Sequence, residues 1–362
     1  MKAISIHLVG LAMLLQPLSV LAEGVHDTFA QKQVGIYLNV KNAGDEEFVS
    51  GVIDRLSNRG IPALVFDIKG YYVYFDSQSG LANEASLVVP LIDLPALIEK
   101  AHSKGIYTIA RYEAVKDKFL GRVFPETRMS HPQTGVALDT EWVHPSHEIV
   151  LEYNRQLIGE IARAGVDEIN LDYIRYPTDN LSSLSTMPTR EKIVHLEAFV
   201  RMARRAIDMS GADTKLGIST YAILGWYYDS TLKNIGQDIV RFAPFVDVIS
   251  PMAYPQTFAL GAYFNPAIHP RTREYYLVSR TLEGYKEILG KEHAWKLRPW
   301  IQGYFVSTGD MTEQIAAVYD AGLCGFTVWS ASNYYQPLYS SLQHASVPER
   351  CSITEKVAQV IE

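Results

Sequence analysis

Three acidic and two basic side chains stand at the ends of short, β-rich runs of the sequence. Asp67 and Lys69 end the run PALVFDIK, Arg111 and Glu113 end IYTIARYE, and Asp172 ends VDEINLD. An ionised carboxylate can act as a nucleophile or a base, and a carboxyl group kept protonated by its surroundings can act as an acid. These residues therefore predict acid–base or nucleophilic chemistry if the fold brings the three runs together.

The order of elements along the chain indicates how they meet. Short β-rich runs alternate with stretches of helical spacing such as Ile149/Tyr153/Leu157/Ile161. The runs begin near Val34, Pro62, Ile106, Val166, Leu216, Val246, Arg298 and Gly325. Strict alternation predicts parallel strands with right-handed crossovers. A doubly wound sheet is the alternative, but the first turn, LNVKNAGDEE, lacks a dinucleotide fingerprint. We therefore expect an α/β fold of the (β/α)₈ TIM-barrel type.

Strand side chains alternate with a period of two, so the apolar residues facing the helices identify those facing the barrel interior. The predicted inward set is Tyr37, Asn39, Asp67, Lys69, Arg111, Glu113, Asn170, Asp172, Ser219, Tyr221, Ser250, Tyr254, Gln302, Tyr304 and Trp329. A structural barrel fills its interior with Val, Ile and Leu. Polar groups here indicate a site at the mouth, or else an ion network in which Lys69 and Arg111 neutralise Asp67 and Glu113.

Long connections add a second signal. The surplus chain lies around residues 70–90, 113–144, 177–188 and 255–271, in loops that follow strands and so reach the C-terminal mouth of a barrel. The chain has 22 Tyr, 13 Phe and 5 Trp, many of them in these loops or at strand ends. Aromatic faces and hydroxyl-binding groups around carboxylates favour a glycan as ligand and glycoside hydrolysis as the reaction.

We assign roles on this basis. Asp172 is the expected nucleophile or base, and either Asp67 or Glu113 is the acid. A close Asp172–Glu113 pair would favour retention of configuration, and a wider Asp172–Asp67 pair would favour inversion. The expected substrate-binding residues are Lys69, Arg111, Asn170, Arg175, Tyr221, Tyr254, Gln302, Tyr304 and Trp329.

The run GVDEINLDYIRYP at 165–177 resembles the fourth strand of a family of bacterial barrels named "putative glycosyl hydrolases". The motifs GIYLNV, VFDIKG, ARYEAVKD, ISPMAYP and GFTVWSASN follow the same family in the same order, over roughly residues 34–340. The resemblance implies a (β/α)₈ fold and makes Asp172, at the end of strand four, the expected catalytic carboxylate.

A more distant likeness, to family 18 chitinases, fails at the catalytic acid. Their strand four reads D-x-x-D-x-D-x-E, whereas Asn170 and Ile174 replace the second Asp and the Glu here. Strand five, LGISTYAILGW, also lacks the Glu of barrel amylases. These missing acids motivate a second hypothesis, a non-catalytic glycan-binding barrel of the cell envelope.

A third hypothesis, a metal-dependent hydrolase, rests on His131, His144 and His147. It is weak because no inward-facing strand residue is a histidine, so we expect no metal and no cofactor. The formal net charge of −7 argues against a nucleic-acid partner. No apolar run of membrane-spanning length follows the N-terminal segment.

The ends of the chain are expected to differ from the barrel. Residues 1–22 have the charge, apolar core and small residues of a secretory signal peptide, which predicts a periplasmic or secreted protein. Residues 23–345 form one expected catalytic domain, and 346–362 form a tail. Export permits a disulfide between Cys324 and Cys351, although two free thiols are an equal alternative.

Overall fold

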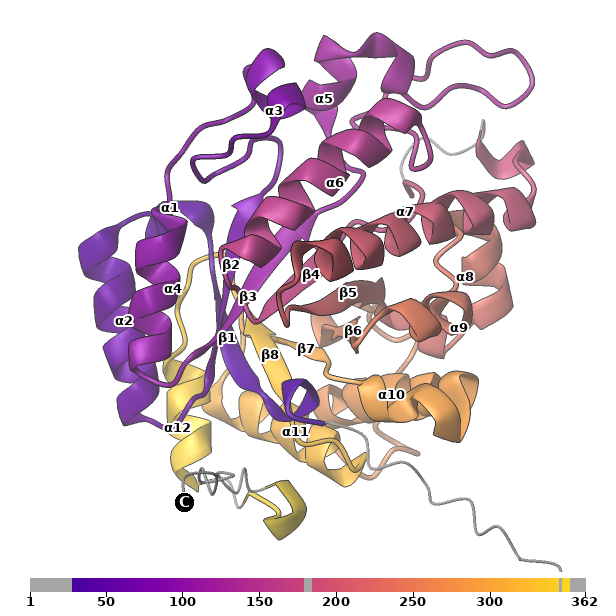
Figure 1. Ribbon diagram of the computed structural model, residues 1–362. Coiled ribbons are helices and arrows are strands. Elements are labelled where there is room, and N and C mark those ends of the chain that lie inside the picture. Colours follow the sequence, from indigo (N-terminus) through magenta and orange to yellow (C-terminus); the bar gives the residue numbers. More distant parts are fainter. Residues whose placement is uncertain (1–27, 179–183, 345–346, 352–362) are drawn as a thin grey trace, which may run out of the picture.

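The computed structural model describes residues 28–178, 184–344 and 347–351. Within these residues, eight parallel strands pair in sequence order and close into a barrel, with β1 bonded to both β2 and β8. Figure 1 shows the strands at the centre and the helices around them. The (β/α)₈ prediction is confirmed, and every strand begins within two residues of its predicted start. The closing β1–β8 pair excludes the doubly wound sheet.

The strands are β1 (Val34–Leu38), β2 (Ala63–Lys69), β3 (Tyr107–Glu113), β4 (Glu168–Asp172), β5 (Lys215–Tyr221), β6 (Val248–Ala253), β7 (Trp300–Gln302) and β8 (Phe326–Trp329). The α-helices are α1 (Val40–Ala43), α2 (Glu46–Asn58), α3 (Gly80–Glu84), α4 (Leu94–Ser103), α5 (Lys118–Val123), α6 (Glu148–Arg163), α7 (Thr189–Ser210), α8 (Tyr228–Ile235), α9 (Ile239–Phe242), α10 (Arg273–His293), α11 (Thr308–Asp320) and α12 (Gln336–His344).

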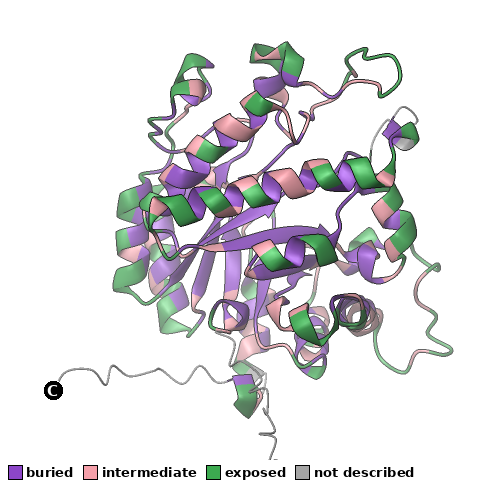
Figure 2. Ribbon diagram, turned by 45° about the vertical axis from the view of Figure 1, so that its right-hand side comes forward, coloured by how far each residue is buried: buried purple, intermediate pink, exposed green. Residues whose placement is uncertain are grey.

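The main core lies between the strands and the surrounding helices. Helix α6 is typical, because Tyr153, Leu157 and Ile161 recur at helical spacing and are fully buried. Its N-terminus is capped by His147, whose ring accepts the backbone N–H of Ile149. Figure 2 shows the same pattern around the barrel, with buried strands inside and exposed residues on the outer sides of the helices.

At the N-terminal ends of the strands, the barrel interior combines apolar side chains with a buried ion pair. Arg298, just before β7, donates from Nη1 and Nη2 to the two carboxylate oxygens of Glu168 in β4, over 2.9 and 2.7 Å. Both side chains are at most 1% exposed. Glycine at position 217 on β5 leaves room for this carboxylate, because a Cβ there would collide with it.

The long βα connections lie where the sequence predicts them. Residues between β2 and α4 contain α3, and those between β3 and α6 contain α5. Figure 1 shows these two short helices together at one end of the barrel. Strand direction therefore places the C-terminal mouth beneath these connections, which is where barrel enzymes hold their active sites.

The two cysteines form a disulfide, so the first of the two alternatives holds. It joins Cys324, two residues before β8, to Cys351, the last residue that the structure describes. The predicted signal peptide and most of the predicted tail lie outside the described residues, and the domain boundaries stay predictions. Within the described part of the chain, every helix is too short or too polar to cross a membrane.

The buried pair gives a stability prediction. In Glu168→Gln the guanidinium of Arg298 stays buried without its counter-charge, so the free energy of unfolding should fall by about 3–5 kcal/mol. Urea denaturation measures this fall. The matched control is Glu152→Gln, on the exposed side of α6, which should change stability by less than about 1 kcal/mol. Equal stabilities of the two variants would contradict the prediction.

Candidate active site at the barrel mouth

Arg111 in β3 brings the three predicted carboxylates together. Its Nη1 lies 2.6 Å from Oδ1 of Asp67 in β2, and its Nη2 lies 2.6 Å from Oδ2 of Asp172 in β4. Glu113, two residues along β3, has Oε1 at 3.4 Å from both Nη atoms. The four side chains are between 11% and 18% exposed, so they are accessible from the mouth while being largely shielded from water.

Further hydrogen bonds fix the two aspartates. The Tyr37 hydroxyl donates to Oδ2 of Asp67 over 2.5 Å. Arg111 Nε donates to Oδ2 of Asp172, while the backbone N–H of Tyr173 donates to Oδ1 over 2.7 Å. Tyr173 adopts a φ of 54°, a left-handed conformation that is uncommon without glycine. Such backbone strain occurs at functional sites, where it sets the direction of a neighbouring group.

Glu113 differs from the two aspartates in its environment. Burial raises its pKa from 4.5 to about 6, against the opposing effect of Arg111. Its contacts with the guanidinium are also longer than those of Asp67 and Asp172. Glu113 is therefore the member of the cluster that is suited to hold a proton near neutral pH.

The prediction that Lys69 faces the barrel interior is wrong. The β2–β3 register shifts between Asp67, which pairs with Arg111, and Lys69, which pairs with Tyr112. Ile68 is the extra residue of this bulge, and it reverses the alternation of sides. Lys69 is instead fully buried against Asp117, with its Nζ 2.7 Å from Oδ2, and lies near the rings of Tyr112 and Tyr153. It is a structural ion pair behind the site.

A cavity of about 650 Å³ opens beside the carboxylates. Six of the predicted catalytic and substrate-binding residues line it, namely Arg111, Asp172, Tyr221, Tyr254, Tyr304 and Trp329, together with Ser219 of the predicted inward set. The lining also includes Tyr263, an aromatic residue of the predicted long loop at 255–271, and residues that sequence reasoning missed, among them Tyr173, Phe258 and Trp300. Trp300 had a usable signal, because it stands two residues before the inward-facing Gln302 on the same strand. Tyr173 had none, because its position depends on an unusual backbone angle.

Aromatic rings form one wall of this cavity. Trp329 stacks on Tyr37 and on Tyr254 at centroid distances of 6.0 Å, and its edge meets Tyr304 at 5.3 Å. Such a wall presents flat apolar faces close to charged and hydroxyl groups. This combination suits a ligand with both apolar faces and hydroxyls.

Three other predicted contact residues support the cavity from outside. Asn170 is fully buried and accepts a hydrogen bond from Ser219. Arg175 packs its guanidinium over the rings of Trp142 and Tyr221, at 4.6 and 4.4 Å.

Gln302 joins two loops of the mouth. Its Oε1 accepts the backbone N–H of Gln256, and its Nε2 donates to the backbone oxygen of Tyr304. For Asn170, Arg175 and Gln302, a role in contacting substrate stays a prediction.

The histidines lie apart from the carboxylates. Burial lowers the pKa of His144 to about 4, and its ring packs against that of His195. His131 and His147 each accept a backbone N–H through Nδ1. Over residues 28–178, 184–344 and 347–351, no three His, Cys, Asp or Glu side chains are grouped as a metal site requires.

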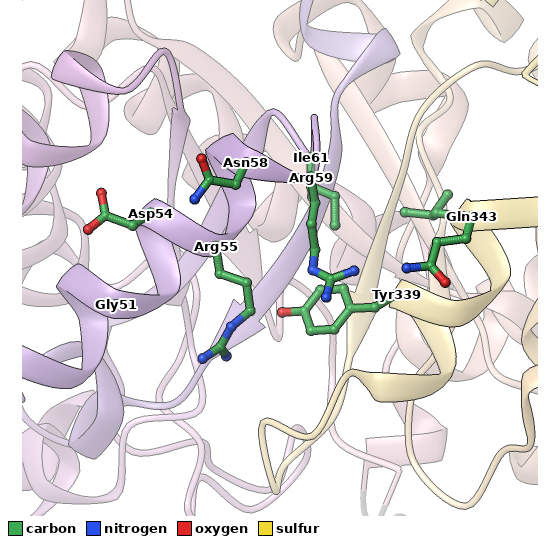
Figure 3. Close-up of a pocket in the computed structure, with 9 residues that line it drawn as sticks. Gly51, Asp54, Arg55, Asn58, Arg59, Ile61, Tyr339 and Gln343 are labelled. Carbon is green, nitrogen blue, oxygen red and sulfur yellow. The ribbon is translucent and has the colours of Figure 1, made fainter.

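A larger cavity, of about 770 Å³, lies on the outside of the barrel between α2 and α12. Figure 3 shows Arg59 beside the ring of Tyr339, with Arg55 and Gln343 nearby. The carboxylate in its lining, Asp54, is paired with Lys104. This cavity lacks the arrangement of an acid beside a second carboxylate, so the mouth is the better candidate for chemistry.

Solved structures with a similar fold include several carbohydrate-active enzymes. The PgaB (BpsB) glycoside hydrolase domain from Bordetella bronchiseptica matches with a TM-score of 0.64 and 14% identity, over 87% of this chain and 99% of that one. The endo-β-1,4-mannanase from Thermotoga petrophila matches with a TM-score of 0.56 and 14% identity, over 86% and 76%. The Bacillus cereus spore cortex-lytic enzyme SleL matches at 0.53 and 10%, over 86% and 74%.

At these identities the structural matches establish the fold alone. No curated protein has a significantly similar sequence. The family model described as "Putative glycosyl hydrolase domain" matches residues 35–335, which include all the barrel strands except Val34 of β1 and all four members of the carboxylate–arginine cluster. The resemblance seen in the sequence motifs is thereby confirmed, and the chain belongs to this glycosyl hydrolase-like family.

Proposed function

We propose that this protein is a glycoside hydrolase that cleaves a polysaccharide or oligosaccharide at the carboxylate cluster. Asp172 acts as the nucleophile and Glu113 as the acid that protonates the leaving oxygen. The observation that carries the proposal is the shared contact with Arg111. Because Nη2 lies 2.6 Å from Asp172 Oδ2 and 3.4 Å from Glu113 Oε1, these oxygens are at most about 6 Å apart.

This separation favours retention of configuration. Retaining enzymes hold their two carboxyl groups about 5–5.5 Å apart, whereas inverting enzymes need about 6.5–9.5 Å to fit a water molecule. In the proposed reaction, Asp172 attacks the anomeric carbon as Glu113 gives its proton to the departing sugar oxygen. Ionised Glu113 then takes a proton from the water that releases the sugar from Asp172.

The choice of Glu113 over Asp67 as the acid rests on their partners. Asp67 accepts hydrogen bonds from Arg111 through Oδ1 and from Tyr37 through Oδ2, so both of its oxygens are already occupied by donors. Glu113 combines a pKa of about 6 with longer contacts to the guanidinium. Asp67 then serves to position Arg111, whose guanidinium holds the Asp172 carboxylate in place through Nε and Nη2.

The aromatic surroundings of the cluster suggest the substrate class, and the expected signal peptide suggests the location. The stacked rings of Trp329, Tyr254 and Tyr37 offer faces for sugar rings, and the neighbouring polar groups can bind hydroxyls. The signal peptide expected at residues 1–22 would bring the protein to the periplasm or the medium, where envelope or extracellular glycans are the available polymers.

Asp172→Asn should keep the fold and lower the release of reducing ends by at least about a thousandfold, because the amide is a poor nucleophile. The measurement is hydrolysis of a panel including β-1,4-mannan, starch, chitin oligomers and peptidoglycan. Asp213→Asn, in the exposed loop before β5, is the control and should keep full activity. Full turnover by Asp172→Asn would overturn the assignment, and glycan binding without any cleavage by the wild type would favour the non-catalytic alternative.

The acid should also set the pH profile. Glu113 must be protonated to donate, so kcat/KM should be highest below about pH 6 and fall about tenfold per pH unit above it. Glu113→Gln should lower kcat and remove this alkaline decline, as seen in a pH–rate profile with a substrate that has a good leaving group. If the decline persists in Glu113→Gln and vanishes in Asp67→Asn, Asp67 is the acid.

A further inference from the structure

Phe305 is an unusual residue at the edge of the mouth. It lies three residues after β7, its side chain is 89% exposed, and its φ is 51°. An aromatic side chain is uncommon in the left-handed region, and residues held in such strained conformations cluster at ligand-binding sites. Neither core packing nor turn chemistry explains a phenylalanine here, since glycine or asparagine would suit this backbone better.

The Phe305 ring extends the aromatic wall of the candidate active site. Its centroid lies 5.9 Å from that of Tyr304, which lines the cavity beside Asp172. Tyr304 in turn meets Trp329 at 5.3 Å. A continuous series of ring contacts therefore runs from the carboxylate cluster out to an exposed phenylalanine.

Beside the 650 Å³ cavity of the mouth, a second, smaller cavity of about 300 Å³ adjoins the Phe305 ring. Phe305 borders it from the loop after β7, and Leu260, which is 86% exposed, borders it from the loop after β6. Its lining also includes the polar residues Gln256, Gln302 and Glu274, together with the apolar Pro255 and Val306.

The wall of this second cavity is firmly held. Arg273, at the start of α10, donates to the backbone oxygens of Pro255 and Phe258. Gln302 bonds the backbone of both Gln256 and Tyr304. The cavity is therefore built from braced loops, and the Gln302 amide physically connects it to the main site.

We propose that Phe305 and this second cavity form a distal subsite for a sugar unit of the same glycan chain that is cut at Asp172. The proposal rests on the proposed function and narrows the substrate to chains long enough to extend beyond the catalytic cavity. Because the subsite continues the aromatic wall of the catalytic cavity, its occupant is a further sugar unit of the same chain. An exposed ring can stack on a sugar face while nearby amide and carboxylate groups bind its hydroxyls.

Phe305→Asn tests the subsite, because asparagine tolerates a positive φ but removes the ring. Binding of the disaccharides and hexasaccharides of β-1,4-linked mannose, glucose and N-acetylglucosamine is measured by calorimetry, alongside kcat/KM where they are cleaved. The wild type should bind the hexasaccharide of its preferred series better than the disaccharide. In Phe305→Asn the ratio of hexasaccharide affinity to disaccharide affinity should fall about tenfold, and where the glycans are cleaved the change should lie mainly in KM. Phe305→Trp, which keeps an aromatic ring, should have the wild-type ratio.

Phe48→Ala is the matched control, because Phe48 is a 41%-exposed phenylalanine on α2, in the outer helix layer. It should leave the chain-length dependence unchanged. Equal hexasaccharide binding by wild type and Phe305→Asn, or wild-type binding that does not depend on chain length, would overturn the subsite. Chain-length-dependent binding that needs Phe305, without cleavage of any glycan, would support the subsite while overturning the proposed hydrolysis.

Discussion

The site depends on one cation surrounded by three carboxylates. Asp67, Glu113 and Asp172 come from three consecutive strands, and their mutual repulsion in a largely buried mouth would be severe without Arg111. The guanidinium is suited to this position because its planar fork can donate to several acceptors at once. Two of its carboxylate partners are held by short contacts and the third by longer ones. This difference in contact length sets Glu113 apart from Asp67 and Asp172.

The barrel supplies the geometry that this cluster needs. The β3–β4 register places Glu113 directly beside Asp172, and neighbouring strands lie about 4.8 Å apart, so the two carboxyl groups are close by construction. Below them, the Glu168–Arg298 pair neutralises the charge at the opposite end of the barrel interior. In both places buried carboxylates are accompanied by an arginine, and the buried Asp117 is likewise accompanied by Lys69.

The sequence was sufficient for the fold and for much of the cluster. Alternating apolar runs locate all eight strands, and the period of two correctly turns Asp67, Arg111, Glu113 and Asp172 toward one another. The same rule, applied two residues earlier on β4 and β7, also points to Glu168 and Trp300. It could not find Tyr173 or Phe305, because their orientation follows from positive φ angles that the residue types do not favour. The proposal of Glu113 over Asp67 as the acid likewise needed burial and distances.

The bulge at Ile68 decides on which side of the sheet Lys69 lies. Asp67 and Lys69 lie two residues apart, yet one faces the mouth and the other is sealed behind it with Asp117. If the strand kept its length and paired without the bulge, Ile68 would lie opposite Tyr112 and Lys69 opposite Glu113. The lysine would then face the mouth, and Asp117 would be buried without its partner. One unpaired residue thus separates two charges that regular alternation would place on the same face, a carboxylate in the mouth and an ammonium group behind it.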